Sequence, residues 1–270
     1  MPVSAFRTAV LSTAASAAAA THVFETSGTT AGQPGTVRLS DTSYYDAAID
    51  ASFAEFVVPD RRTRFTCISL LPPASVRPRS SLGYMVERLV HRFGQGNAIC
   101  PMLPTGAVDV PALRRALASA CEGEDPVLVF ATTIALDVVS ETWPPDVRMT
   151  LPPGSRVMDT GGPKGRVRIA DRASLRVWAA EHWGVPQALF VGELGMTELA
   201  SQRYETTARH ALVGDIEAHR VYVGPPWLRS LVVDPMTLRP VEQGAPGLVG
   251  HVDLANLQTC AFILTSDLGR

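Results

Sequence analysis

The sequence Ala-Leu-Phe-Val-Gly-Glu-Leu-Gly-Met-Thr-Glu, residues 188–198, contains the pattern that decides the fold. Residues 188–191 form a short apolar run of the kind that becomes a buried strand. A polar, glycine-containing segment follows at once, and ligands of open α/β sheets bind outside the carboxyl ends of the strands. Thr197 can donate to a phosphate oxygen, and Glu198 is a hard oxygen ligand suited to Mg²⁺. The alternative is the start of a helix with a solvated glutamate.

Strand-like and helix-like segments alternate around this stretch, which predicts an α/β fold with a mainly parallel sheet flanked by helices. Bounded apolar runs give the expected strands, which are residues 65–71, 127–131, 156–158 and 188–191. Apolar stripes at helical spacing give the expected helices, which are residues 42–57, 81–93, a segment after Asp109, and 172–182. Capping residues support these boundaries: Ser40, Asp41, Asp109 and Asp171 precede helices and Gly184 follows one.

The pattern changes after about Ile216, where short strands separated by turns replace the alternation. The expected strands are residues 221–223, 231–233, 247–252 and 261–264, and the turns include Asp234-Pro235. This predicts a smaller C-terminal β-rich subdomain. We therefore expect an Ala-rich N-terminal stub over 1–21, an α/β core over 22–215 and a β-rich subdomain over 216–270.

The composition is typical of a globular protein, with 270 residues, 46% hydrophobic and 19% charged. The formal net charge of −2 gives no electrostatic reason to expect a nucleic acid or an anionic membrane as partner. No apolar run is long enough to span a bilayer. Residues 5–20 weakly suggest a signal peptide, but their apolar core is short and a packing helix is favoured. We expect a cytoplasmic protein.

The segment Thr26-Ser27-Gly28-Thr29-Thr30 follows a strand-like His22-Val23-Phe24. Glycines and small hydroxyl residues let backbone N–H groups approach an anion closely, so this loop can bind phosphate. The Gly-Lys-Ser/Thr ending of a Walker loop is absent. An ordinary turn is the alternative.

A second glycine segment, Asp159-Thr160-Gly161-Gly162-Pro163-Lys164, follows the expected strand at 156–158. Paired glycines allow a flat ring to approach the backbone, and Lys164 can pair with a phosphate or carboxylate. A basic surface turn is the alternative. Near the C-terminus, Asp253-Leu254-Ala255-Asn256 precedes Thr265-Ser266-Asp267-Leu268-Gly269-Arg270, where Asp267 could accept both hydroxyls of a ribose or simply stabilise a turn.

These motifs, in this order, resemble those of the adenylate-forming enzymes and most closely the acyl-protein synthetases of bacterial luminescence, the LuxE family. The resemblance covers about residues 22–270 and implies the fold of the large N-terminal domain of those enzymes, with ATP and Mg²⁺ as cofactors. It assigns catalysis to Thr197, Glu198 and Lys164, and the metal to Glu198. It assigns nucleotide binding to Thr26, Ser27, Gly28, Thr29, Thr30, Gly161, Gly162, Gly195, Met196 and Asp267.

Two departures from the family pattern affect this interpretation. Leu194 stands where the family has a tyrosine that stacks on adenine, so base binding should be weaker. Family members also have a sizeable helical segment before the Ser-Gly-Thr-Thr loop and continue past the Asp-Leu-Gly-Arg hinge into a C-terminal mobile lobe, so by this resemblance the sequence is expected to be truncated at both ends. We expect either a fragment of a longer enzyme or a reduced protein.

The leading hypothesis is ATP-dependent activation of a carboxylic acid, a fatty acid by resemblance, to an acyl-adenylate with transfer to a thiol on a protein or carrier. A homo-oligomer or a reductase partner would accompany it. The alternatives are an aryl acid activator similar to phenylacetate-CoA ligase, a catalytically incomplete core that binds a nucleotide or a partner, and an unrelated α/β protein. The cysteines, Cys67, Cys100, Cys121 and Cys260, are scattered, which disfavours zinc and disulfides, and none stands out as the acceptor.

Overall fold

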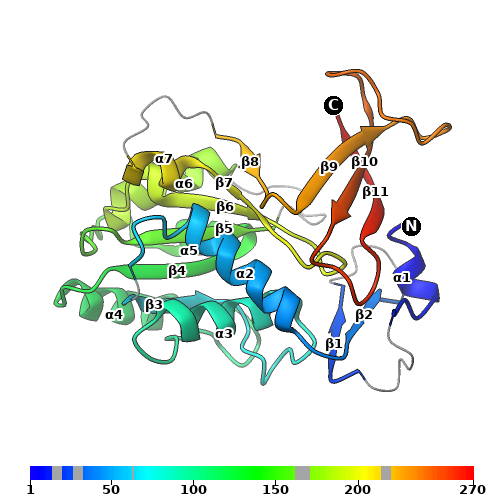
Figure 1. Ribbon diagram of the computed structural model, residues 1–270. Coiled ribbons are helices and arrows are strands. Elements are labelled where there is room, and N and C mark those ends of the chain that lie inside the picture. The colour runs from blue at the N-terminus through cyan, green and yellow to red at the C-terminus, as the bar shows by residue number, and fades with distance from the viewer. Residues whose placement is uncertain (14–19, 27–32, 63, 162–170, 214–219) are drawn as a thin grey trace.

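The computed structural model describes residues 1–13, 20–26, 33–62, 64–161, 171–213 and 220–270. Its largest element is a six-stranded sheet in the order β3-β4-β5-β6-β7-β8 (Figure 1). The first four strands are parallel and the last two pair antiparallel. Their bounds are β3 Thr66–Leu70, β4 Val127–Thr132, β5 Arg156–Thr160, β6 Phe190–Leu194, β7 Arg203–Glu205 and β8 Tyr222–Val223.

Helices pack on both faces of this sheet, as parallel strands with helical crossovers require. On one face, α2 packs against α3 and α7, and on the other α5 packs against α6. The helices are α1 Ala5–Thr8, α2 Ser43–Phe56, α3 Ser81–Phe93, α4 Val110–Cys121, α5 Thr133–Thr142, α6 Arg172–Trp183 and α7 Thr207–Val213. The predicted α/β class with a mainly parallel sheet is confirmed.

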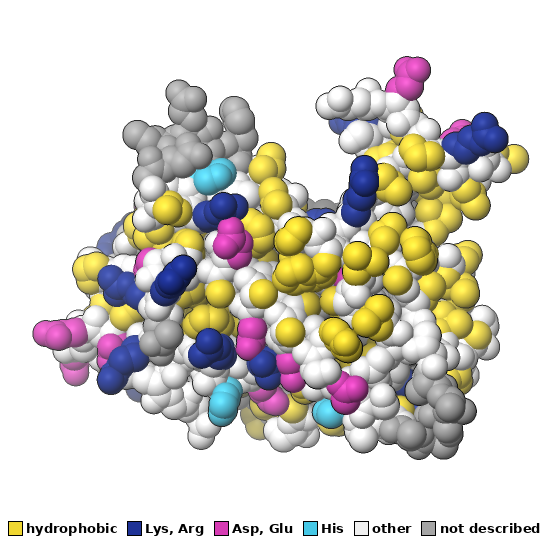
Figure 2. Space-filling model, in the orientation of Figure 1, with side chains coloured by type: hydrophobic (Ala, Val, Ile, Leu, Met, Phe, Trp, Pro, Cys, Tyr) yellow, Lys and Arg dark blue, Asp and Glu magenta, His cyan; other side chains and the backbone are white. Residues whose placement is uncertain are grey.

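Two small antiparallel sheets lie together beside the large one (Figure 1). One pairs β1 His22–Glu25 with β2 Thr36–Leu39. The other has the order β11-β10-β9 and contains β9 Leu228–Val233, β10 Gly247–Asp253 and β11 Phe262–Gly269. It is the predicted β-rich subdomain. Hydrophobic side chains gather over this region on the face seen in Figure 2.

Several local predictions need correction. The strand expected at 188–191 begins at Phe190, because Gln187–Leu189 form a 3₁₀ turn after Pro186. The segment at 221–223, expected in the small subdomain, pairs with β7, so the large sheet continues beyond residue 216. Thr42 rather than Ser40 or Asp41 is the N-cap of α2, although Asp41 accepts the Ser43 N–H at 2.9 Å.

The capping predictions for the other helices are confirmed. Asp109 accepts the N–H of Ala112 at the start of α4, and Asp171 accepts that of Ser174 at the start of α6. Gly184 ends α6 with a φ of 67°, in the left-handed region that glycine occupies most easily. Within the described residues, no helix is long and apolar enough to cross a membrane.

One buried cation joins the amino end of β5 to the segment that follows α2. The side chain of Arg156, at the start of β5, is fully buried and donates to Asp60 at 2.5 Å and to the Val57 carbonyl at 2.5 Å. Its guanidinium also lies 5.1 Å from the centre of the Phe65 ring. These contacts compensate the buried charge, and the opposite, carboxyl end of the strands is left for a site.

Candidate functional site

A cavity of about 700 Å³ opens at the carboxyl ends of the parallel strands. Leu70, Thr132, Thr160 and Glu193, which lie at or near the ends of β3 to β6, all line it. One part of its wall is apolar and includes Leu71, Met85, Met102, Val108, Ile134 and Val138. Another part is polar and includes Thr26, Ser80, Ser81, Thr197, Glu198 and Gln202. The cavity therefore lies where open α/β sheets bind ligands.

The structure brings six of the predicted site residues to this cavity, namely Thr26, Gly161, Gly195, Met196, Thr197 and Glu198. It does not bring Asp267 to it, since Asp267 is exposed on β11 and is not part of the cavity wall. Six further predicted residues, Ser27, Gly28, Thr29, Thr30, Gly162 and Lys164, lie outside the described residues.

Thr197 and Glu198 follow β6 and present different groups to the cavity. The Thr197 hydroxyl lies 3.0 Å from the Ser81 hydroxyl, at the start of α3. Glu198 is only 8% exposed, and burial raises the pKa of its carboxyl, against a smaller opposing effect of Arg7. A cation next to this carboxyl would favour its ionised form.

The residues present fit a magnesium ion shared with a ligand. No group of three His, Cys, Asp or Glu side chains within the described part of the chain could hold a metal by itself. Mg²⁺ in nucleotide sites is held by one or two carboxylates together with phosphate oxygens and water. Glu198 could supply the carboxylate, and the phosphates would have to supply the other ligands.

The carboxylate of Asp253 holds the loop that carries Glu198. Asp253 is fully buried at the end of β10 and accepts the N–H groups of Ala200 and Ser201, both at 2.9 Å, and the Ser201 hydroxyl at 2.8 Å. Asn256 donates to the Glu198 carbonyl at 2.7 Å. The Asp-Leu-Ala-Asn segment thus connects the C-terminal sheet to the cavity wall.

Backbone conformation favours glycine at position 161, and lack of space favours it at position 195. Gly161 has a φ of 83°, and its carbonyl accepts hydrogen bonds from Thr133 at 3.1 Å and from Arg172. At Gly195, a Cβ atom would lie 2.4 Å from Oε1 of Glu193. Any side chain at Gly195 would therefore displace the Glu193 carboxyl.

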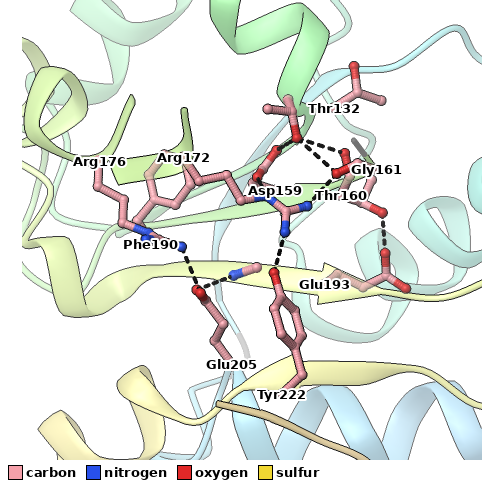
Figure 3. Close-up of polar contacts among 12 residues, drawn as sticks. Thr132, Asp159, Thr160, Gly161, Arg172, Arg176, Phe190, Glu193, Glu205 and Tyr222 are labelled. Carbon is pink, nitrogen blue, oxygen red and sulfur yellow. Dashed lines mark hydrogen bonds and ion pairs between the residues drawn. The ribbon is translucent and has the colours of Figure 1, made fainter. Parts of the chain in front are cut away.

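A network of charged side chains around the buried Asp159 and Glu205 lies beneath the cavity (Figure 3). Arg172, on α6, donates to Asp159 at 2.6 Å, to the Tyr222 hydroxyl and to the Gly161 carbonyl. Glu205 accepts from Arg176 at 2.7 Å and from Arg220 at 3.0 Å. These pairs fix the ends of β5 and β6 relative to β7 and β8.

Glu193 lies on the cavity side of this network. Its exposed fraction is 3%, and the Thr160 hydroxyl donates to its Oε2 (Figure 3). Burial raises the pKa of Glu193 to about 7, with smaller opposing effects of Thr160 and Arg172. Burial also raises the pKa of Asp159 to about 6.

Sequence reasoning missed Glu193 and Arg172 as members of the site. The one available signal for Glu193 was a charged residue inside an otherwise apolar strand. Nothing in the sequence around Arg172 distinguishes it from a surface residue of a helix, because its partners Asp159 and Tyr222 are distant along the chain.

Comparisons with solved structures identify relatives of this fold. ATP-bound MatB from Rhodopseudomonas palustris superposes with a TM-score of 0.61 at 18% identity, over 92% of this chain and 45% of that one. The amide bond synthetase McbA from Marinactinospora thermotolerans gives a TM-score of 0.60 at 20% identity, over 92% and 46%. The long-chain-fatty-acid-CoA ligase FadD1 from Archaeoglobus fulgidus gives 0.59 at 18%, over 89% and 43%.

The chain has the fold of adenylate-forming enzymes. It spans a little under half the length of these three structures. Among curated proteins, it is 42% identical over 45 residues to a long-chain-fatty-acid–luciferin-component ligase from Aliivibrio fischeri, which is 17% of this chain and 12% of that protein. No known protein-family profile matches.

We predict that Asp253→Ala lowers the free energy of unfolding by about 2–4 kcal/mol, because it leaves buried N–H groups of the Glu198 loop without an acceptor. Chemical denaturation measures this change. Asp234→Ala is the matched control, since Asp234 also accepts two backbone N–H groups, but in an exposed turn where water replaces it. We expect about 1 kcal/mol or less there. Equal losses would contradict this role of Asp253.

We also predict that ionisation of Glu193 lowers the free energy of unfolding as the pH rises. Its pKa rises from 4.5 in the unfolded chain to about 7 in the native one, so the native state binds the proton more tightly between these values. Ionisation as the pH rises through this window therefore destabilises the fold. Relative to Glu193→Gln, the wild type should lose about 1–3 kcal/mol between pH 5 and pH 8.

Denaturation of both proteins across this pH range measures the difference. Asp159 titrates in both proteins, so its contribution largely cancels. Stability curves that stay parallel from pH 5 to pH 8 would show that Glu193 is ionised throughout.

Proposed function

We propose that this chain is the nucleotide-binding core of a ligase that activates a carboxylic acid with ATP. The observation that carries the proposal is the placement of Gly195, Thr197 and Glu198 at the carboxyl end of β6, on one cavity with polar and apolar walls. ATP-bound MatB, which has the same fold, supports it.

In this proposal, the polar part of the cavity holds the nucleotide. The Thr197 hydroxyl donates to a phosphate oxygen, and Glu198 would supply the carboxylate that holds Mg²⁺. Gly161, Gly195 and Met196 form the wall against the base and the sugar. We keep residues 26–30, Gly162, Lys164 and Asp267 as further proposed contacts because of the motifs to which they belong.

The reaction is one of positioning and charge stabilisation. A carboxylate oxygen of the acid attacks the α-phosphorus, the bond from that phosphorus to the bridging oxygen breaks, and pyrophosphate leaves. The residues of this chain hold the two reactants together and exclude water from the apolar side. Mg²⁺, when bound, offsets the phosphate charge.

The sulfur of a thiol on a protein or carrier then attacks the acyl carbon, the bond from that carbon to the phosphate oxygen breaks, and AMP leaves as the thioester forms. Burial raises the pKa of the Cys67 thiol to about 12 and raises those of Cys100 and Cys121. Thiols with raised pKa values are poor nucleophiles, which favours an acceptor outside these three side chains. A LuxE-like fatty acid substrate is supported by the short match to the luciferin-component ligase, and an aryl acid is the alternative.

A second candidate function is binding of a nucleotide or a partner without catalysis. Leu194 favours it, because an exposed leucine replaces the aromatic side chain that would stack on the base. The two candidates share the cavity and differ in whether the α-phosphorus is attacked.

We predict that Glu198→Gln removes the gain in ATP affinity that Mg²⁺ provides. For the wild type, Mg²⁺ should tighten ATP binding at least tenfold, measured as the rise in melting temperature with ATP in Mg²⁺ or in EDTA. Glu242→Gln, in an exposed turn, is the matched control and should keep the full gain. An unchanged magnesium effect in Glu198→Gln would refute the assigned role.

The same proteins separate the two candidate functions. An acid-dependent exchange of labelled pyrophosphate into ATP, lost in Glu198→Gln, would support activation. Mg²⁺-dependent ATP binding without exchange for any acid would support the binding protein.

A further inference from the structure

We propose that the Glu193 carboxyl recognises a hydrogen-bond donor on the acid substrate, so that the chain selects carboxylic acids bearing an amine or a hydroxyl group over plain acids of equal length. This inference rests on the proposed function and names the substrate class of that same cavity. Three observations support the inference: the direction of the Glu193 side chain, the residues that line the cavity around it, and its hydrogen-bond partner.

The register of the sheet places Glu193 on the α2–α3 side. Glu193 pairs with Thr160 on β5 and with Tyr204 on β7, so the three side chains leave the sheet on one face. The Tyr204 hydroxyl meets Met85 of α3, and Met85 and Tyr45 line the cavity together with Glu193. Glu193 therefore projects into the space between the sheet and these two helices.

The cations of the buried network do not bond to Glu193. Asp159, one residue before Thr160, leaves the sheet on the opposite face, where Arg172 binds it. Arg172 directs its donors to Asp159, Tyr222 and Gly161 (Figure 3). Among the ion pairs of the described residues, none includes Glu193, and Thr160 is the donor that bonds to it there.

An ionised carboxyl in this position destabilises the fold unless a cation or hydrogen-bond donors compensate its charge. Burying a carboxylate without a paired charge or enough donors opposes folding by several kcal/mol. The fold nevertheless makes room for it, because Gly195 leaves the space that Oε1 of Glu193 occupies. A ligand donor in the cavity would supply the compensation that the described side chains do not.

The acid, rather than the nucleotide, is the better candidate for this donor. Glu193 lines the cavity together with Tyr45 and Met85, between the sheet and helices α2 and α3. The next residue, Leu194, leaves β6 on the other side and is 49% exposed. An ammonium would pair with the carboxylate as a charge, and a hydroxyl would donate to it as a neutral group.

The experiment measures binding of matched acids to the whole chain in saturating Mg-ATP by calorimetry. The panel contains straight-chain acids of six to ten carbons in three forms: plain, with a terminal hydroxyl and with a terminal amine. We expect the wild type to bind either the acid with a terminal hydroxyl or the acid with a terminal amine at least tenfold more tightly than the plain acid of the same length. Which form binds more tightly identifies the donor.

Variants test whether Glu193 is the source of this preference. Glu193→Gln should reduce the ratio between amino and plain acids at least fivefold, because it removes the charge and keeps the shape. Glu87→Gln, on the solvent side of α3, should leave the ratio unchanged. If Glu193→Gln does not fold, the ratios of the wild type still test the substrate class, and equal or tighter binding of the plain acid would overturn the inference.

The outcomes separate this inference from the proposed function. Mg-ATP binding together with equal or tighter binding of the plain acids would overturn the inference and leave the function standing. Glu193→Gln could instead change the ratio of the affinities for ATP and inosine triphosphate and leave the acid ratios unchanged. That result would assign the Glu193 carboxyl to the nucleotide base and would also overturn the inference. Binding of neither ATP nor any acid by the folded chain would overturn both.

Discussion

The contacts of the Asp253 carboxylate are the constraint on which the geometry of the site depends. The loop after β6 has no regular backbone pairing of its own until β7, and Asp253 replaces that pairing by accepting two N–H groups and a hydroxyl. Asn256 adds a hydrogen bond to the carbonyl of Glu198. The orientation of Glu198 toward the cavity therefore depends on a sheet far away along the chain.

Buried charge is distributed unevenly around this loop. Beneath the cavity, the arginines from α6 and from the segment before β8 neutralise Asp159 and Glu205, which locks the strand ends in place. On the cavity side, Glu193 and Glu198 are buried with raised pKa values, and among the described residues neither forms an ion pair with an arginine or lysine. A cavity with two buried carboxyls of this kind favours ligands that supply a cation or a hydrogen-bond donor.

The sequence predicted the four parallel strands because they are short apolar runs, and it predicted α4 and α6 because both have clear caps, but it missed α5 between β4 and β5. The cavity residues at 195–198 were also predicted, since the loop follows directly from a strand. Asp267, predicted as a contact of the ribose hydroxyls, lies exposed on β11 and outside the cavity wall, because that strand continues through Gly269. The Asp253 clamp, the Glu193 pair with Thr160 and the Arg172 network join residues from different elements, and only the folded chain brings them together.

The most direct test of the account is a methyl spectrum of the chain labelled at its seven methionines. Met85, Met102 and Met196 line the cavity, whereas Met149 and Met236 do not. We predict that Mg-ATP shifts the resonance of Met196, that addition of an acid substrate then shifts Met85 or Met102, and that Met149 and Met236 stay in place. Shifts confined to Met149 or Met236, or no shift at saturating ATP, would contradict the assignment of this cavity as the site of acid activation.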